Sequence, residues 1–176
     1  MMRLLCICGS LRATSTNMAL LHALRDTAPP EFELAVYDGL GGLPIFSPDE
    51  EAERTPPQVS RLIEAVALAD GLIIACPEYA HGVPGGLKNA LDWLVSGEAP
   101  IGKPVMLVHA SPRSMFARAA LREILKTMSL AVFDGAELEV SLIGKKPPDF
   151  EPILSDPVIR DMMRASLVEF GRFIKH

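Results

Sequence analysis

The sequence predicts a doubly wound α/β fold, in which helices cover both faces of a five-stranded parallel sheet. Three observations support this prediction. Short apolar runs alternate with longer segments whose apolar residues recur at helical spacing. Several of the short runs are apolar along their whole length, as expected for strands covered on both faces. The length of 176 residues fits one domain, residues 1–176, so the alternating elements belong to a single sheet.

The first half of the chain supplies three strands and three helices. Each predicted strand is a short apolar run, and the first ends in a glycine turn signal. Prolines stand near the start of two predicted helices, where the first turn tolerates them. The strands are Arg3–Gly9, Phe32–Tyr37 and Gly71–Cys76, and the helices are Asn17–Ala28, Pro56–Ala69 and Pro84–Val95. Asp38–Thr55 is rich in glycine, proline and acidic residues and is predicted to be a loop.

The second half continues the alternation. A strand over Pro104–Ala110 precedes a helix over Phe116–Ser129, and the last strand is predicted over Leu138–Ile143. Gly144–Pro157 is proline-rich and is predicted to be a surface segment, and Val158–Ile174 is predicted to be the final helix. Right-handed crossovers would bring the loops that follow the strands to one edge of the sheet, where α/β proteins bind ligands.

Composition excludes several classes of protein. Hydrophobic residues make up 49% and charged residues 22% of the chain, which excludes a wholly disordered or fibrous protein. The net charge of −5 gives no indication of nucleic acid as a partner, and no run is long and apolar enough to span a membrane. The odd count of three cysteines argues against a disulfide framework, and no signal peptide is recognisable, so we expect a cytoplasmic protein. Cys6 and Cys8 lack the further ligands that zinc requires, and no metal site is predicted.

The loop after the first strand has the composition of an anion-binding site. Hydroxyl, amide and guanidinium groups gather there, at the start of a helix whose free N–H groups favour anions. These residues are Ser10, Arg12, Ser15, Thr16 and Asn17. The loop lacks the glycine spacing of dinucleotide-binding and NTPase loops, so a terminal phosphomonoester fits better than a pyrophosphate. The alternative is that Ser15 or Thr16 merely caps the helix, although one cap would leave the other groups unexplained.

The loop after the third strand is suited to a flat ring. Prolines stiffen both ends of Pro77–Pro84, and Gly82 permits a close approach of backbone to ligand. The backbone N–H groups around Tyr79–Gly82 would suit a ring edge that carries carbonyl and imide groups. Glu78 is expected to pair with Lys88 or to accept backbone hydrogen bonds within the loop rather than to act as an acid or base. We interpret His81 as a surface histidine, because no nucleophile or carboxylate partner is evident.

Together the two loops resemble the NADPH-dependent FMN reductase family, a group of flavodoxin-like flavoproteins that includes bacterial quinone, chromate and azo-dye reductases. The resemblance covers Arg3–Ser129, and the weaker match Leu43–Asp49 resembles the family's loop after the second strand. Its motifs are Gly9-Ser10-Leu11-Arg12 with Ser15 and Asn17, then Pro77-Glu78-Tyr79, and then Gly82-Val83-Pro84-Gly85-Gly86-Leu87-Lys88-Asn89-Ala90-Leu91-Asp92-Trp93.

The resemblance implies a flavodoxin-like three-layer sandwich with strand order 2-1-3-4-5 and bound FMN. It places the FMN phosphate on Ser10, Arg12, Ser15, Thr16 and Asn17. It places the flavin ring along the loop after the third strand, mostly through backbone, at Pro77, Glu78, Tyr79 and Ala80, with His81 and Gly82 also at the cofactor site. It places Ser111, just past the fourth strand, along the other side of the ring or the ribityl chain.

Two places depart from the family's pattern. Ala80 stands where many members carry asparagine, so one side-chain contact is expected to be missing and His81 is expected to replace part of it. Ser111–Arg118 lacks the glycines that members usually have there. We therefore expect this loop to sit differently, with consequences for nicotinamide access and substrate choice more than for FMN binding.

The resemblance implies an oxidoreductase in which FMN takes hydride from NADPH or NADH. Two electrons then pass, in a ping-pong cycle, to a small-molecule acceptor such as a quinone or free flavin, and no catalytic side chain is assigned. Members of the family are commonly dimers or tetramers, so the resemblance implies a homodimer or homotetramer. Tyr79, Trp93 and the Gly39–Pro48 loop are expected to supply partly exposed apolar surface for the subunit interface. Two alternatives stay open: a flavodoxin-type one-electron carrier and a non-catalytic flavin-binding sensor.

Overall fold

The centre of the molecule is a parallel sheet. The computed structural model describes residues 1–53, 55–135 and 137–176. Its strands run in the order β2-β1-β3-β4-β5, with β6 also pairing with β4, which confirms the predicted topology. The strands are β1 Met2–Cys8, β2 Phe32–Tyr37, β3 Gly71–Ala75, β4 Pro104–His109, β5 Ala131–Val132 and β6 Leu138–Glu139.

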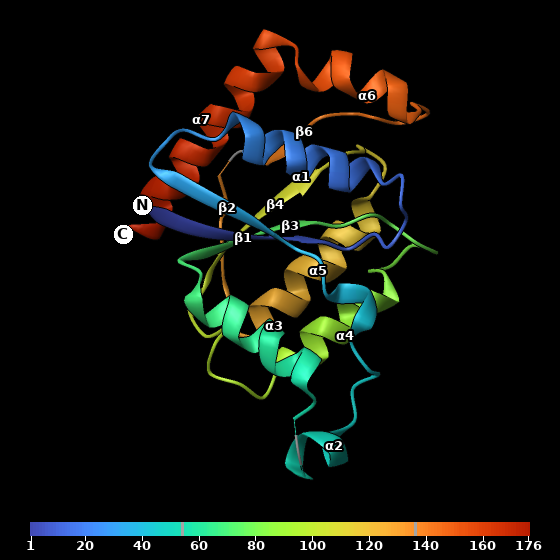
Figure 1. The fold of residues 1–176 in the computed structure, drawn as a ribbon, viewed down its shortest axis with the longest axis vertical. Helices are drawn as coiled ribbons and strands as arrows, with labels where there is room; N and C mark the ends of the chain where they lie inside the picture. Colours follow the sequence, from blue (N-terminus) through green and yellow to red (C-terminus); the bar gives the residue numbers. More distant parts are fainter. Residues whose placement is uncertain (54, 136) are drawn as a thin grey trace.

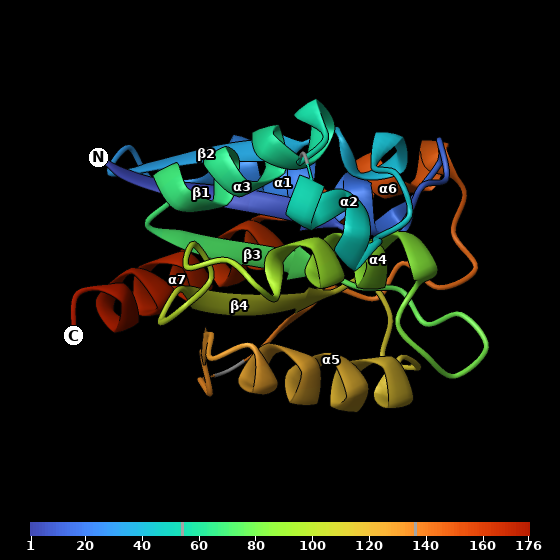
Figure 2. The same ribbon diagram turned by 90° about the horizontal axis from the view of Figure 1, so that it is seen from below.

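Helices cover both faces of this sheet (Figures 1 and 2). One face carries α1 Thr16–Thr27, α6 Pro147–Leu154 and α7 Pro157–Ile174, and the other carries α3 Pro57–Leu68, α4 Gly85–Leu94 and α5 Met115–Thr127. Strand β1 separates the two layers, because Leu5 and Ile7 belong to the core under α3 and α4 while Leu4 and Cys6 belong to the core under α1 and α7. Both faces are therefore buried, which explains why the strand reads as one apolar run.

Two segments predicted to lack regular structure contain short helices. Asp38–Thr55 holds a 3₁₀ turn, η1 Leu40–Gly42, and a helix, α2 Pro48–Glu53, which opens with a proline and three acidic residues that favour a helix start. Gly144–Pro157 contains α6, whose start is capped by a 2.9 Å hydrogen bond from Lys146 N to Asp149 Oδ2. The two loop predictions are wrong for the same reason: proline is common in loops, but it is also favoured at the first position of a helix, where Pro48 and Pro147 stand.

The last strand is shorter than predicted. Leu138–Glu139 alone forms β6, and the separate strand Ala131–Val132 pairs with the first residues of β4. The chain beyond β6 still follows the sheet, because Val140 N donates to His109 O at 2.9 Å and Leu142 N donates to Ala110 O at 3.0 Å. The fifth position of the sheet is thus filled by two short pieces in succession.

Two residues of α4, Asn89 and Trp93, hold the segment that follows β2 against this helix. Asn89 Oδ1 accepts from Phe46 N at 2.8 Å, and Asn89 Nδ2 and Trp93 Nε1 each donate to Pro44 O at 2.8 Å. Trp93 is only 1% exposed and meets Phe46 edge to face, so the expectation that Trp93 supplies exposed surface is wrong. Asn89 and Trp93 are four residues apart and therefore lie on one face of the helix, so both can bond to the same carbonyl of Pro44.

No helix in the described part of the chain combines the length and the apolar character needed to cross a membrane.

Candidate functional site

Three loops meet at the carboxyl edge of the sheet. The turns after β1, β3 and β4 enclose a cavity of about 310 Å³. The turn after β1 packs closely against the turn after β3 and against α4. A Cβ built on Gly9 would lie 3.2 Å from Pro77 Cδ and 3.0 Å from Leu87 Cδ2. The cavity is lined by Thr16, Asn17, Cys76, Pro77, Glu78, Ser111, Arg113 and Ser114. Five of the predicted site residues are therefore in one place: Thr16, Asn17, Pro77, Glu78 and Ser111.

The start of α1 supplies one wall of this cavity. Ser15 is the N-cap, and its Oγ accepts from Met18 N at 3.3 Å, which confirms the capping alternative for this residue. Asn17 is only 7% exposed and lines the cavity, and we find no hydrogen-bond partner for its side chain within the described residues. An amide that lines a cavity at a helix N-terminus, without a partner among the described residues, fits an anionic ligand.

Ser10 joins the loops after β1 and β3. Its Oγ lies 3.3 Å from Tyr79 Oη and accepts from Arg12 N at 3.4 Å, and the residue is only 5% exposed. Arg12 and Tyr79 line a neighbouring cavity of about 290 Å³ together with Gly9, Leu11, Pro84, Gly85 and Gly86. The first cavity thus holds five of the predicted residues and the second holds Arg12 and Tyr79, to which Ser10 is bonded. The predicted residues Ser15, Ala80, His81 and Gly82 line neither cavity.

Residues Tyr79–Gly82 form a tight hairpin turn. Tyr79 N donates to Gly82 O at 3.1 Å, and Gly82 N donates to Tyr79 O at 3.0 Å. Ala80 and His81 both have positive φ, 49° and 59°, as in a type I′ turn. The expectation that all of these amides face a ligand is therefore wrong for Tyr79 and Gly82, whose N–H groups are used within the turn, whereas those of Ala80 and His81 are not part of this pair of bonds.

His81 is exposed and stacks on Phe116 at the start of α5. The ring centroids are 4.5 Å apart and the planes differ by 13°. Phe116 is itself 58% exposed, and the neighbouring Met115 is 72% exposed. An aromatic pair at this edge leaves apolar surface open to solvent beside the loops of the candidate site.

Glu78 is bound to backbone, but neither to Lys88 nor within its own loop, so both predicted partners are wrong. Its Oε2 accepts from Ala117 N at 3.0 Å, in the first turn of α5, whereas Lys88 pairs with Asp92 at 2.5 Å. The N-cap residue of α5, Ser114, makes no capping hydrogen bond with its side chain. Glu78 therefore satisfies a free N–H of the helix from another loop, and its negative charge suits a helix N-terminus.

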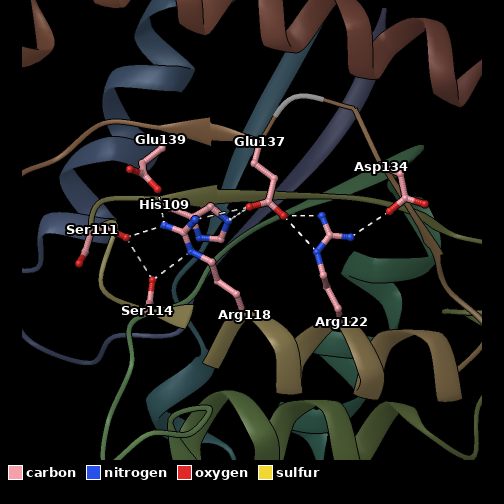
Figure 3. Close-up of polar contacts among 8 residues, drawn as sticks. All are labelled: His109, Ser111, Ser114, Arg118, Arg122, Asp134, Glu137 and Glu139. Atoms are coloured by element: carbon pink, nitrogen blue, oxygen red, sulfur yellow. Dashed lines mark hydrogen bonds and ion pairs between the residues drawn. The ribbon is translucent and has the colours of Figure 1, made fainter. Parts of the chain in front are cut away.

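A charged cluster behind the loop after β4 was missed by the sequence reasoning (Figure 3). Arg118 and Arg122 project from α5 toward Glu137, and Arg118 Nη2 lies 2.5 Å from Glu139 Oε2. His109, only 1% exposed at the end of β4, has its Nε2 2.8 Å from Glu137 Oε2. The one available signal was the spacing of the two arginines, which stand four residues apart on one helix face.

Burial decides the protonation of several side chains near this edge. Burial and the charge of Arg118 lower the pKa of His109, despite its contact with Glu137. Burial alone would raise the pKa of Glu137, but the hydrogen bonds and charges of Arg122 and His109 together outweigh it and lower the pKa. Burial raises the pKa values of Cys6 and Cys76 to about 12, so both are neutral thiols at physiological pH.

Comparison with known proteins identifies the family. A model of the NADPH-dependent FMN reductase family matches residues 2–143. The quinone reductase of Escherichia coli K12 is 33% identical over 174 residues, which span 95% of this chain and 92% of that protein. An NAD(P)H-dependent FMN reductase of Pseudomonas aeruginosa is 34% identical over 170 residues, which span 94% of this chain and 91% of that protein.

A solved structure supports the fold. The NAD(P)H:(acceptor) oxidoreductase flavoenzyme of Paracoccus denitrificans superposes with a TM-score of 0.83, covering 99% of this chain and 98% of that chain at 23% sequence identity. The family match and the relatives confirm the resemblance stated above, together with the oxidoreductase class and the FMN and NAD(P)H cofactors. The chain belongs to the NADPH-dependent FMN reductase family.

Proposed function

We propose that this chain transfers two electrons from NADPH or NADH, by way of FMN, to a quinone, free flavin or related acceptor in a ping-pong cycle. One observation carries the proposal: Asn17, whose amide has no hydrogen-bond partner among the described residues, lines a cavity at the N-terminus of α1. That combination suits a phosphate group. The quinone as acceptor follows the name of the Escherichia coli relative.

The residues present fit FMN at this edge of the sheet. The start of α1 with Thr16 and Asn17 would hold the phosphate, assisted by Ser10, Arg12 and the cap residue Ser15. The ring would lie against the loops after β3 and β4, at Pro77, Glu78, Tyr79, Ala80, His81, Gly82 and Ser111. When bound, FMN supplies the centre that accepts hydride from the nicotinamide and delivers electrons to the acceptor.

The protein's share of the chemistry is to position groups and not to exchange protons. Glu78 is engaged with Ala117 N, and His81 is stacked on Phe116, so neither is held as a general acid or base. The amides of Ala80 and His81 are the proposed donors toward the ring edge, because the turn does not use them for its own closure. We therefore assign no catalytic side chain.

A homodimer or homotetramer in the cytoplasm completes the proposal. Apolar side chains that stand open near the candidate site would be covered by a second copy of the chain. They are Leu11 at 61%, Tyr79 at 46%, Met115 at 72% and Phe116 at 58% exposure.

The visible spectrum of the purified protein tests this function. FMN released by heating should identify the cofactor by chromatography, and anaerobic NADPH should bleach the flavin absorption, with the colour returning when a benzoquinone is added. Initial rates at varied NADPH and quinone should give parallel double-reciprocal lines. Absence of flavin, even after reconstitution with FMN, would refute the proposal. Bound FMN that neither NADPH nor NADH reduces would favour the carrier or the sensor.

A further inference from the structure

The loop after β4 forms one wall of the FMN cavity and contains no glycine. Ser111 and Ser114 both line the cavity. Within the loop, Arg113 N donates to Ser111 Oγ at 3.1 Å, and Ser114 Oγ donates to Ser111 O at 3.2 Å. The loop therefore closes on itself and presents the carbonyl of Ser111 toward α5.

The guanidinium of Arg118 holds both ends of this loop (Figure 3). Its Nη2 donates to Ser111 O at 2.6 Å, and its Nε donates to Ser114 Oγ at 3.2 Å. A planar guanidinium with fixed donor directions restrains geometry more than a single flexible donor would. The wall of the cavity thus depends on one side chain that does not itself line the cavity.

Arg118 is in turn fixed by acidic residues on the far side. Its Nη2 also lies 2.5 Å from Glu139 Oε2, and its Nη1 lies 3.6 Å from Glu137 Oε2. The side chain is only 19% exposed, and the two carboxylates offset part of the cost of removing its charge from water. Glu137 is shared with Arg122, which binds it and Asp134 but makes no hydrogen bond to the loop among the described contacts.

The same turn of α5 also holds the opposite loop, because Ala117 N donates to Glu78 Oε2 at 3.0 Å. Two adjacent residues of the helix therefore anchor the loops after β3 and β4, between which the ring of FMN is proposed to lie. The start of α1, where the phosphate is proposed, makes none of these contacts in the described structure.

We propose that Arg118 is a positioning residue for the flavin: it fixes the Ser111–Ser114 wall and so strengthens binding of the ring and ribityl part without contributing to phosphate binding. This inference rests on the proposed FMN site. Loss of Arg118 should therefore weaken riboflavin and FMN to the same extent, whereas loss of a phosphate ligand weakens FMN alone.

The test compares Arg118→Gln with Arg122→Gln, a matched control one helical turn away that shares Glu137. Dissociation constants of FMN and riboflavin for the apoprotein are measured by quenching of flavin fluorescence. Arg118→Gln should weaken both ligands by about tenfold, the scale of a charged hydrogen bond lost from the wall. Arg122→Gln should leave both within about twofold. The visible circular dichroism of bound FMN, which reports how the ring is held, should change in Arg118→Gln only.

A second variant keeps the inference testable if Arg118→Gln fails to fold. Ser114→Ala removes one contact of Arg118 with the loop but leaves its ion pairs intact, and it should weaken both flavins by about threefold, with little further loss when combined with Arg118→Gln. The inference would be overturned if Arg118→Gln and Arg122→Gln lost the same flavin affinity. It would also be overturned if neither Arg118→Gln nor Ser114→Ala lost affinity, or if the loss concerned FMN but not riboflavin. A wild-type protein that binds no flavin would instead refute the proposed function.

Discussion

Glu78 Oε2 accepts a hydrogen bond of 3.0 Å from Ala117 N, so a residue of the loop after β3 caps the helix that follows β4. The contact joins two loops that lie 39 residues apart in the chain at the mouth of the candidate site. It also gives Glu78 a structural role, because the carboxylate satisfies a helix N–H that the cap residue Ser114 leaves unpaired.

Glu78→Ala should lower the free energy of unfolding by about 1 kcal/mol, the usual effect of removing a helix cap. Glu78→Gln should lower it less, because the amide oxygen can still accept from Ala117 N. Urea unfolding followed by circular dichroism measures both. The exposed Glu123 on the same helix is the control, and Glu123→Ala should change stability by less than about 0.5 kcal/mol. Loss of NADPH turnover by Glu78→Gln at full FMN occupancy would contradict a purely structural role.

The turn at Ala80 offers a test of backbone strain. Ala80 has a φ of 49°, a region that disfavours a residue with a Cβ unless its side chain is asparagine or aspartate. Ala80→Asn should therefore raise the free energy of unfolding by about 0.5–1 kcal/mol. The same change at Ala120, on the exposed face of α5, should instead lower it by about 0.5 kcal/mol, because asparagine is a poor helix former. Thermal unfolding of the two variants would contradict the strain argument if both shifts had the same sign.

The alternation of strand and helix was predictable because burial on both faces leaves a strong local pattern. The run from Gly71 to Ala75 is buried at every residue, and the apolar periodicity of α5 and α7 is equally clear. The prediction failed where proline could indicate either a loop or the start of a helix. At Pro48 and Pro147 a proline begins a helix, although the surrounding residues have the composition of a loop.

The candidate site was predictable only where its groups are local in the chain. The start of α1 follows from the spacing of Ser15, Thr16 and Asn17 alone. Arg118 binds Glu139, which lies 21 positions further along the chain, and this contact depends on how β6 lies against β4. No periodicity encodes that register, so the role of Arg118 emerges only from the structure.

Arg12 provides a test of the proposed phosphate site. Arg12→Ala should weaken FMN binding by about 1.5–3 kcal/mol if its guanidinium makes a charged hydrogen bond to the phosphate. Riboflavin lacks that phosphate, so its affinity should hardly change. Titration of the apoprotein with each flavin measures both values, and Arg164→Ala on α7, whose arginine pairs with Asp161, is the control. Equal losses for the two flavins would place Arg12 outside the phosphate site.

His109 gives the stability of the protein a specific dependence on pH. Burial and the charge of Arg118 lower its pKa below the ordinary 6.5, although Glu137 and Glu139 act in the opposite direction. Below about pH 6.5 the unfolded chain therefore takes up a proton that the folded protein refuses, so the stability falls as the pH falls. Glu137, whose pKa is lowered from 4.5, acts in the same direction at lower pH, because its stabilisation is lost as the carboxylate is protonated.

His109→Gln removes the first of these two contributions. The free energy of unfolding of the wild-type protein, taken from urea titrations, should fall more steeply than that of the variant as the pH falls below about 6.5, with a difference in slope of at most about 1.4 kcal/mol per pH unit. Above about pH 7.5 the two slopes should agree, because histidine is then neutral in both the folded and the unfolded chain. His176→Gln, at the exposed chain end, serves as the control and should follow the wild type throughout. A variant whose stability falls as steeply as that of the wild type would mean that His109 takes up its proton in the folded protein, with Glu137 outweighing burial and Arg118.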